Sequence, residues 1–203
     1  MFYKTQDNQH GLPHDPFKAI VAPRPIGWIG SRGRDGSVNL APYSYFNAIS
    51  DRPKLVMFSS AGRKDTLRNV EETRVFTTSM VSRSLAEKMN LSSADAPYGE
   101  SEFAFADLTM AEGRLVDAPF VSEAYAALEC QVTDIFEAKG LDGAPSANIV
   151  VIGQVMGIHI DEAALVDGML DMSIAAPLGR LGYMDYADAS QAFQMRRPPW
   201  TKG

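Results

Sequence analysis

Two long β-patterned runs stand on either side of a single turn, and together they restrict the fold most. Residues 126–136 alternate between apolar and polar, with Glu129 on the polar side. The apolar members of this run are Leu128, Cys130 and Val132. A glycine-containing turn over residues 139–145 follows, and residues 148–160 form a second apolar run. Alternation of this kind places one face of a strand in the core and the other in solvent. The two runs predict a long hairpin and a β-rich fold.

Shorter runs of β-forming residues precede this hairpin and add strands to the fold. They lie at residues 26–32, 37–41, 43–50, 54–60 and 75–81, and Asp35-Gly36 predicts a tight turn between the first two. The run at 54–60 is apolar throughout, which predicts burial on both faces. Helices are predicted after Asp65, as the N-cap, and over residues 83–91, which begin with a capping box. The pattern predicts a β-dominated α+β fold, most simply a barrel with a few peripheral helices.

Length and composition limit the classes of protein that this chain can be. Its 203 residues suit a single domain over 1–203, with 1–14 as an irregular arm and 188–203 as a tail. The formal net charge of −6 argues against a nucleic-acid partner. Cys130 is the one cysteine, so no intrachain disulfide forms, and its apolar surroundings predict a buried side chain rather than a nucleophile. Without a signal-peptide pattern or an apolar run of membrane-spanning length, we expect a soluble, cytoplasmic protein with no membrane partner.

The stretch from Asn39 to Ile49 is unusually polar for a predicted strand. Two asparagines, a serine and two tyrosines stand among its apolar residues. A strand that only filled the core would carry Val, Ile and Leu on its inward face. Buried amide and hydroxyl groups need hydrogen-bond partners. A planar ligand with several hydrogen-bonding groups would supply them.

A polar loop between the strand at 54–60 and the next helix predicts an anion site. It offers two hydroxyls and two cations immediately before the helix starts. The residues concerned are Ser59, Ser60, Arg63, Lys64, Asp65 and Thr66. Free backbone N–H groups and the helix dipole favour a phosphate at such a position. We expect the Asp65 carboxylate to compete for those N–H groups. The alternative is an ordinary capped surface helix with a solvated Arg-Lys pair.

Other chemistries have no support in the sequence. HExxH, CxxC, GxSxG and Walker-type motifs do not occur, and the glycines at 27, 30 and 33 open no helix. No metal site or catalytic side chain is predicted. The loop over residues 92–108 predicts either a lid or an edge insertion, in which Tyr98 and Phe103 would cover a ligand or pack on their own domain.

Three stretches together resemble a known family. They are residues 23–28 (PRPIGW), 39–47 (NLAPYSYFN) and 57–69, from Met-Phe-Ser-Ser to Lys-Asp-Thr-Leu-Arg-Asn. The chain resembles the flavin reductase-like proteins, a family of FMN-binding split barrels related to flavoredoxin, over about residues 15–187. The resemblance implies a Greek-key split β-barrel, a homodimer, and FMN bound near the subunit interface.

The resemblance also implies roles for particular residues. The isoalloxazine and ribityl groups would contact one set: Trp28, Ile29, Ser31, Asn39, Ala41, Pro42, Tyr43 and Ser44. The phosphate would lie among a second set, at the predicted anion site: Ser59, Ser60, Lys64, Asp65 and Thr66. The implied reaction is hydride transfer from NADH or NADPH to the flavin, which carries the chemistry without a catalytic side chain.

Three functions remain open on the sequence. The first is an NAD(P)H-dependent FMN oxidoreductase. The second is an FMN-binding electron carrier without nicotinamide activity, and the third is a barrel that binds no flavin. The electron acceptor is open as well, with a monooxygenase or another redox protein as the expected partner.

Overall fold

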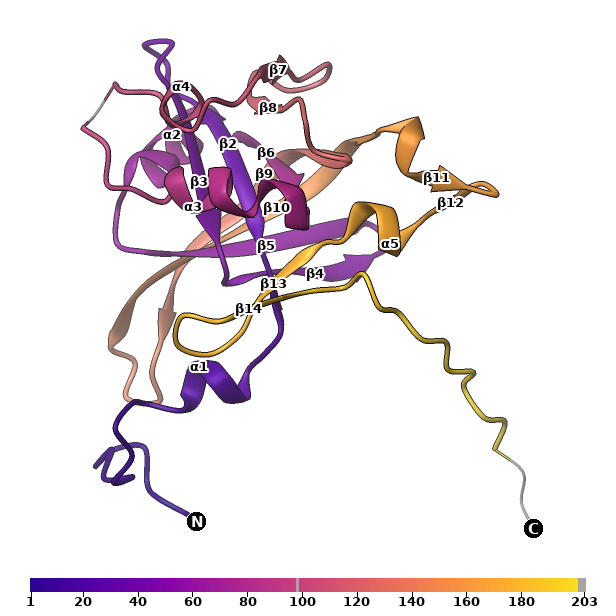
Figure 1. The fold of residues 1–203 in the computed structure, drawn as a ribbon. Coiled ribbons are helices and arrows are strands. Elements are labelled where there is room, and N and C mark those ends of the chain that lie inside the picture. Colours follow the sequence, from indigo (N-terminus) through magenta and orange to yellow (C-terminus); the bar gives the residue numbers. More distant parts are fainter. Residues whose placement is uncertain (98, 201–203) are drawn as a thin grey trace.

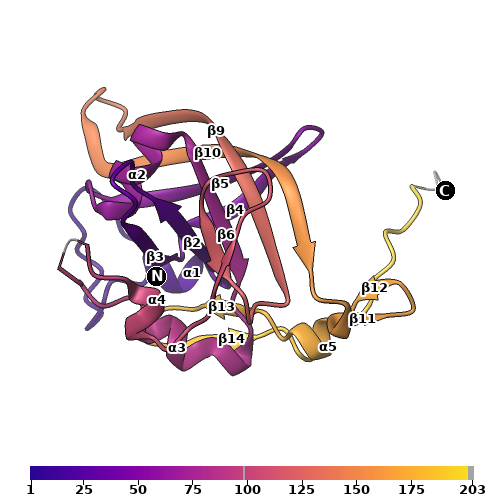
Figure 2. The ribbon, with the colours of Figure 1, turned by 90° about the horizontal axis from the view of Figure 1, so that it is seen from above.

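A seven-stranded antiparallel sheet forms the body of the molecule in the computed structural model, which describes residues 1–97 and 99–200 (Figure 1). In spatial order its strands are β3 (Val38–Tyr43), β2 (Gly27–Arg32), β6 (Val75–Met80), β9 (Ala126–Lys139), β10 (Pro145–Ile160), β5 (Lys54–Ala61) and β4 (Phe46–Asp51). Seen from above, the strands curl around a common interior (Figure 2).

The strand order makes this sheet a Greek-key split barrel, as predicted. β6, β9 and β10 follow one another as antiparallel neighbours, and β5, which precedes them in sequence, pairs with β10. That arrangement of four strands is a Greek key. In the described part of the chain, β3 and β4 are the two ends of the sheet and no strand pairing joins them. The barrel is therefore open along one side.

Short elements surround the sheet. The helices are α1 (Phe17–Ile20), α2 (Asp65–Thr73), α3 (Ala86–Leu91), α4 (Glu102–Phe105) and α5 (Met172–Ala175), with 3₁₀ turns η1 (Arg83–Leu85) and η2 (Glu162–Ala164). Three small sheets lie beside the main sheet. In the first, β13 (Leu178–Arg180) pairs with both β1 (Arg24–Pro25) and β14 (Tyr186–Asp188). The other two are hairpins: β7 (Met110–Glu112) with β8 (Pro119–Val121), and β11 (Leu165–Val166) with β12 (Met169–Leu170). None of the helices in the described residues is both long and apolar enough to cross a membrane.

The polar stretch from Asn39 to Ile49 lies on two strands, in agreement with the separate runs predicted at 37–41 and 43–50. β3 ends at Tyr43, the chain bends at Ser44 and Tyr45, and β4 begins at Phe46. β3 and β4 then run to opposite ends of the sheet order. The bend is held where the Ser59 N–H donates to the Tyr45 carbonyl at 2.9 Å.

Two predictions about burial are wrong. In β5 the buried residues alternate with partly exposed ones, so only one face of that strand is fully buried. In β9, Glu129 is buried rather than solvated, and its side chain is 1% exposed. The segment 114–116 returns over the outer face of β9 and covers this carboxylate. Cys130 is buried as predicted, and this burial, with the nearby Glu129 charge adding to it, raises the pKa of its thiol to about 12.

Apolar residues form two core clusters on either side of β2. One is centred on Trp28 with Leu40 and Val121, and the other on Phe58 and Phe76, whose rings meet edge to face at 5.3 Å. Burial of such side chains contributes roughly 1.5–3 kcal/mol each. Gly30 allows the close approach of β8, because a Cβ there would fall 1.9 Å from the Pro119 carbonyl oxygen.

Candidate active site

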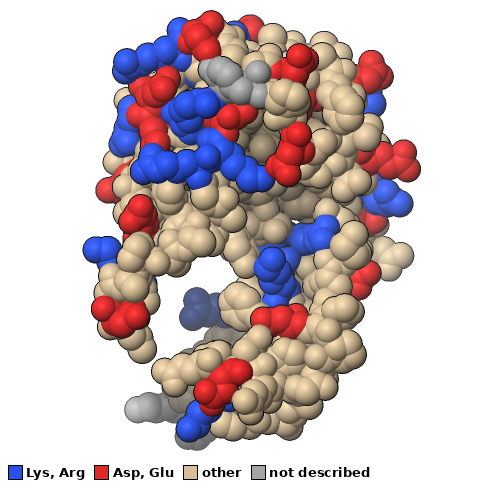
Figure 3. All heavy atoms as spheres, turned by 90° about the vertical axis from the view of Figure 1, so that its left-hand side faces the viewer, with Lys and Arg blue, Asp and Glu red and all other residues tan. Residues whose placement is uncertain are grey.

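A pocket of about 390 Å³ opens where β3, β5 and the start of α2 meet, and we call it the Thr66 pocket. Its volume lies within the roughly 300–1,000 Å³ that is usual for small-molecule sites. The connection from α3 to α4 closes its opposite wall. Seen from the side where that connection lies, Lys and Arg side chains mix with Asp and Glu above a hollow in the surface (Figure 3).

The turn from β5 into α2 leaves backbone donors free at the pocket. Gly62 has a φ of +79°, which reverses the chain, and the Ser60 hydroxyl donates to the Gly62 carbonyl at 2.9 Å. The N-cap of α2 is Lys64, in an extended conformation, and no side chain caps the helix. An uncapped first turn carries unsatisfied N–H groups. Such groups, with the helix dipole, attract an anion.

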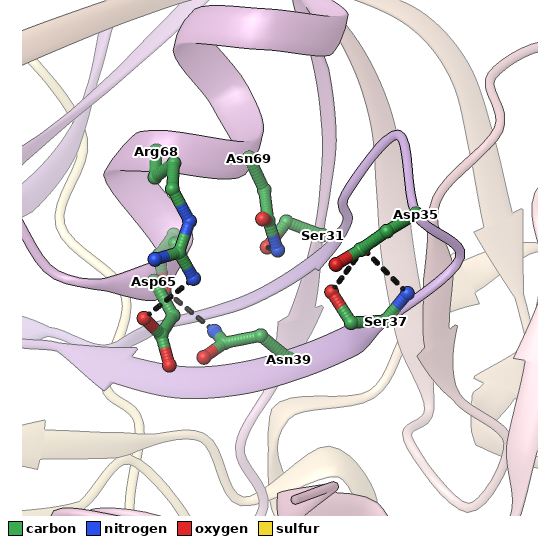
Figure 4. Close-up of polar contacts among 8 residues, drawn as sticks. Ser31, Asp35, Ser37, Asn39, Asp65, Arg68 and Asn69 are labelled. Carbon is green, nitrogen blue, oxygen red and sulfur yellow. Dashed lines mark hydrogen bonds and ion pairs between the residues drawn. The ribbon is translucent and has the colours of Figure 1, made fainter. Parts of the chain in front are cut away.

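Asp65 is not the N-cap that the sequence predicted. It is the first residue of α2, and its carboxylate accepts a hydrogen bond from Nη2 of Arg68 at 2.8 Å (Figure 4). We expected this carboxylate to compete with an anion for the helix N–H groups. The carboxylate instead pairs with Arg68, one turn along the helix. Within the described residues, the N-cap side chain also makes no capping hydrogen bond to the first turn of α2.

Buried polar contacts connect α2 and α4 with β3. The Asn39 amide donates to the Thr66 hydroxyl at 2.7 Å, and both side chains are buried. On the same strand, the Leu40 N–H donates to the Glu102 carboxylate at 2.9 Å. Burial raises the pKa of Glu102, although this hydrogen bond opposes the shift. Together these contacts fix β3 as one wall of the pocket.

The charges at the pocket mouth are paired weakly. Lys64 Nζ lies 2.9 Å from the Asp95 carboxylate, which raises the pKa of Lys64 and lowers that of Asp95. The Asp95 side chain is 90% exposed, so the pair is a solvated one of small net stability. Burial raises the pKa of Tyr43, against the influence of the Thr66 and Ser60 hydroxyls and the Lys64 charge. Its phenol is therefore neutral at physiological pH.

Most residues predicted to hold a cofactor line this pocket. They are Asn39, Ala41, Pro42, Tyr43, Ser44, Ser59, Ser60, Lys64, Asp65 and Thr66. They come from two separate motifs, and the fold brings these motifs together because β3, the β3–β4 bend and the β5–α2 turn meet at the open side of the barrel.

Four predicted residues lie outside the lining. Trp28 and Ile29 are fully buried in the core, and the Trp28 indole donates to the hydroxyl of Ser92, a pocket residue, at 2.8 Å. Ser31 is buried and accepts a hydrogen bond from the Asn69 amide of α2 at 3.2 Å (Figure 4). Arg63 is exposed and pairs with Glu71 at 2.5 Å. In this structure the first three support the pocket from behind, and a role for Arg63 at the ligand remains a prediction.

Other lining residues were not among the predicted site residues, although Tyr45 and Ala61 lie within the motif stretches. They are Tyr45, Ala61, Ser92, Ser93, Ala94, Asp95, Ala96, Glu102 and Asn148. The unusual length of the 92–108 loop was the one available hint, and its first part does form a wall. Phe103 packs in the core, which confirms the prediction that it packs on its own domain. Tyr98 lies outside the described residues. Asn148 donates to the Ser59 hydroxyl at 3.1 Å across the β10–β5 pair, a contact that no local pattern predicts.

The arrangement suits a ligand with an anionic end and a polar, planar body. Hydroxyls, an ammonium group and free backbone donors gather at the α2 end. Amide, proline and aromatic groups of the Asn39–Tyr45 stretch form the remaining wall. Such a mixture of apolar walls and a few convergent polar groups is typical of small-molecule and cofactor sites.

Comparison with known proteins agrees with this geometry. A relative from Halalkalibacterium halodurans, of unassigned function, is 33% identical over 184 residues, covering 88% of this chain and 87% of its own length. The structure of nitrilotriacetate monooxygenase component B from Bacillus cereus is 29% identical, with a TM-score of 0.86, covering 96% of this chain and 98% of that one. Flavoredoxin of Desulfovibrio vulgaris shares the fold at 24% identity, with a TM-score of 0.76 and coverage of 85% and 90%.

The family model described as the flavin reductase like domain matches residues 21–177. This range contains all three motif stretches and every strand that surrounds the Thr66 pocket. The match extends over more than half of the chain. The chain therefore belongs to the flavin reductase like domain family.

Proposed function

We propose that the Thr66 pocket binds FMN and that the protein is an NAD(P)H-dependent flavin oxidoreductase. The observation that carries the proposal is the uncapped N-terminus of α2, which opens onto a pocket lined by Ser60, Lys64 and Thr66. Membership of the flavin reductase like domain family supports flavin over other phosphorylated ligands.

The α2 end of the pocket fits the phosphate group. Ser59 and Thr66 offer hydroxyl donors, the Ser60 hydroxyl being the donor to Gly62, and Lys64 offers a charge-assisted hydrogen bond. Because the Lys64–Asp95 pair is solvated, a phosphate can take over the ammonium group with little loss of stability. The free N–H groups at the start of α2 are further donors, and a single phosphate group would accept from all of them.

The β3 wall fits the rest of the cofactor. Asn39 and Ser44 present hydrogen-bonding groups, Ala41 and Pro42 present small apolar surfaces, and Tyr43 presents a neutral phenol. Trp28, Ile29 and Ser31 lie on β2, which pairs with β3 and holds this wall in place. The role of these residues is to orient the flavin ring and to exclude water from one face.

The chemistry that FMN supplies when bound is acceptance of a hydride from a reduced nicotinamide and its later release as electrons. The chain contributes binding, orientation and shielding, and no side chain needs to act as acid or base. The Ser92–Ala96 segment covers the wall opposite β3 and limits water there. We propose no catalytic residue.

We also propose a homodimer. Met156, Ile158 and Ile160 alternate along β10 and are 46%, 52% and 46% exposed. Residues two apart share one face of a strand, so they form an apolar stripe. Such stripes mark contact surfaces, and a second copy of the chain would cover it. Light scattering should give twice the chain mass, and a chain mass of one would remove this part of the proposal.

The physiological partner is proposed from a relative. The similar Bacillus cereus protein is component B of a monooxygenase. We propose that this chain likewise passes reducing equivalents to a separate protein, either a monooxygenase or another redox partner.

Anaerobic reduction of the FMN-loaded protein tests the activity. Added NADH or NADPH should bleach the flavin absorbance in a single turnover. If neither nucleotide bleaches it but a chemical reductant does, the protein is an FMN-binding electron carrier instead. If the protein takes up no FMN, it is a barrel with another ligand.

A further inference from the structure

A second pocket, of about 400 Å³, adjoins the Thr66 pocket, and we call it the Arg24 pocket. The two share the lining residues Pro42, Ser44 and Ser93, so they are continuous at the β3 wall. The further walls of the Arg24 pocket come from α1, β1, β13 and β14. It therefore offers a second compartment beside the proposed flavin site.

Three cations line the Arg24 pocket, and no acidic residue does. They are Lys18, Arg24 and Arg180. Within the described residues, no carboxylate lies within ion-pair distance of any of the three. The chain as a whole has a net charge of −6, so this local excess of positive charge is the reverse of the general trend.

Arg24 is a buried cation with spare donors. It is 7% exposed, and its guanidinium donates to the carbonyls of Lys18, Val21 and Leu181. Its Nε is buried and has no hydrogen-bond partner. The Nε is covered by the protein, but the guanidinium charge still lacks a counter-ion, which is unfavourable unless a ligand supplies one.

Strand pairing places a second guanidinium on the same face. Arg24 of β1 stands directly opposite Arg180 of β13 in the antiparallel register. Side chains opposite each other in such a pair point to one side of the sheet, and like charges there destabilise the pair. An anion between the two would remove this repulsion.

Aromatic rings complete the pocket. The Arg180 guanidinium lies 4.4 Å from the centre of the Tyr186 ring, and its Nη2 donates to the Tyr183 carbonyl at 2.5 Å. Both tyrosines line the pocket. Cations beside aromatic faces suit a ligand that carries both a diphosphate and a planar base.

We propose that the Arg24 pocket binds the diphosphate and adenosine part of the reduced nicotinamide dinucleotide, with the nicotinamide reaching the Thr66 pocket past Ser44 and Ser93. This inference rests on the proposed function. Lys18 and Arg180 are positioning residues for the donor, because they hold the part of it that does not react.

Titration calorimetry with ADP-ribose, which lacks the nicotinamide, tests the pocket without any hydride transfer. FMN-loaded wild type should bind ADP-ribose, and the double variant Lys18→Gln/Arg180→Gln should bind it at least about tenfold more weakly, since charge-assisted contacts are lost. A matched control, Lys139→Gln/Arg196→Gln, removes two exposed cations elsewhere and should bind like wild type. Arg24 is kept, because it ties α1 to the 181–186 loop.

Two further measurements, of nicotinamide binding and of FMN binding, distinguish a failure of this inference from a failure of the proposed function. In stopped-flow reduction, the double variant should show a dissociation constant for NADH or NADPH raised by about tenfold, with the limiting rate changed less than about twofold. Its FMN affinity should equal that of wild type. No binding of ADP-ribose, or equal binding by wild type and the double variant, would overturn the inference while leaving FMN uptake and reduction intact. Weaker FMN binding by the double variant would assign the pocket to the flavin and overturn it too.

Discussion

The Thr66 pocket and the cluster around Glu129 are both regions of buried polar groups. They differ in whether those groups find their hydrogen-bond partners within the chain. The Glu129 carboxylate accepts from the N–H groups of Arg114, Leu115 and Val116 at 2.9, 2.6 and 2.9 Å. His159 Nε2 lies 2.6 Å from the same carboxylate. We call these five residues the Glu129 cluster. In the Thr66 pocket, by contrast, no N-cap side chain accepts from the first turn of α2 in the described part of the chain.

The difference separates a structural polar cluster from a binding site. Burial opposes ionisation of Glu129, but its hydrogen bonds outweigh that effect and lower its pKa to about 2. All of its capacity is used within the chain, so it stabilises the 114–116 segment on β9. The Thr66 pocket keeps donors in reserve and has room for a ligand. A buried polar group therefore indicates a ligand only where the chain leaves it unsatisfied.

The largest expected effect is on stability, from Glu129→Ala. This change leaves His159 and three N–H groups, one of them buried, without their acceptor, and breaking a cluster around a buried charge costs about 3–5 kcal/mol. Chemical denaturation would measure the loss in the free energy of unfolding. FMN affinity of the folded fraction should stay unchanged. A stability loss below about 1 kcal/mol would contradict the structural role given to the cluster.

Acid should weaken the same cluster. Because the folded pKa of Glu129, about 2, lies below its ordinary value of 4.5, its stabilising effect is complete above pH 4.5 and is lost as the pH falls towards 2. The expected loss is about 3 kcal/mol. Denaturation curves recorded between pH 6 and pH 2 should show it. Glu129→Gln, which cannot ionise, should flatten this part of the pH profile, and an unchanged profile would rule out Glu129 as its source.

In the pocket, the double change Lys64→Ala/Thr66→Ala should act mainly on binding, with a stability loss of about 1–3 kcal/mol because the buried Asn39 amide loses its Thr66 acceptor. Loss of charge-assisted phosphate contacts should weaken FMN binding roughly ten- to hundredfold. A fluorescence titration measures this, and Lys54→Ala/Thr133→Ala serves as a control with the same residue types outside the pocket. Equal affinity of the pocket variant and wild type would remove both residues from the site.

A smaller effect is expected from Glu102→Gln. The amide can still accept the Leu40 N–H, but the negative charge on the pocket wall is lost. FMN should bind several-fold more tightly at neutral pH, since repulsion of the phosphate is reduced. Because burial raises the pKa of Glu102, wild type should gain affinity on acidification more than the variant does. Titrations of both proteins at two pH values would show parallel changes if this explanation is wrong.

The smallest effect is expected from Asp95→Asn. Removing the solvated partner of Lys64 should free the ammonium group and tighten FMN binding by at most about threefold. The gain should disappear in high salt, because exposed charges are screened. A loss of affinity would instead show that Asp95 contacts the ligand.

Much of the fold could be predicted because the signals are local. The Asp35-Gly36 turn, the hairpin of β9 and β10, and the helix after Lys64 each follow from neighbouring residues. The pocket lining from β3 and from the β5–α2 turn could be predicted because each is one continuous motif. The alternating pattern of β9 predicted a solvated Glu129. This prediction is wrong because the segment 114–116, which lies outside the pattern, covers the polar face of the strand there.

The rest of the site depends on contacts between distant segments. Ser92–Ala96, Glu102 and Asn148 reach the pocket through the strand order, and no motif in their own stretches shows this. The separate runs at 37–41 and 43–50 predict the break between β3 and β4, but no local pattern predicts that these strands lie at opposite ends of the sheet. Arg24 and Arg180 are 156 positions apart in the sequence, so no short pattern predicts their pairing.

The most direct test of the central claim is to add FMN to the purified protein, remove free flavin by gel filtration, and record the visible spectrum. The account predicts a flavin spectrum, with about one FMN released per chain on denaturation, and a clear loss of bound FMN in Lys64→Ala/Thr66→Ala. A wild-type protein that remains colourless after this treatment would contradict it.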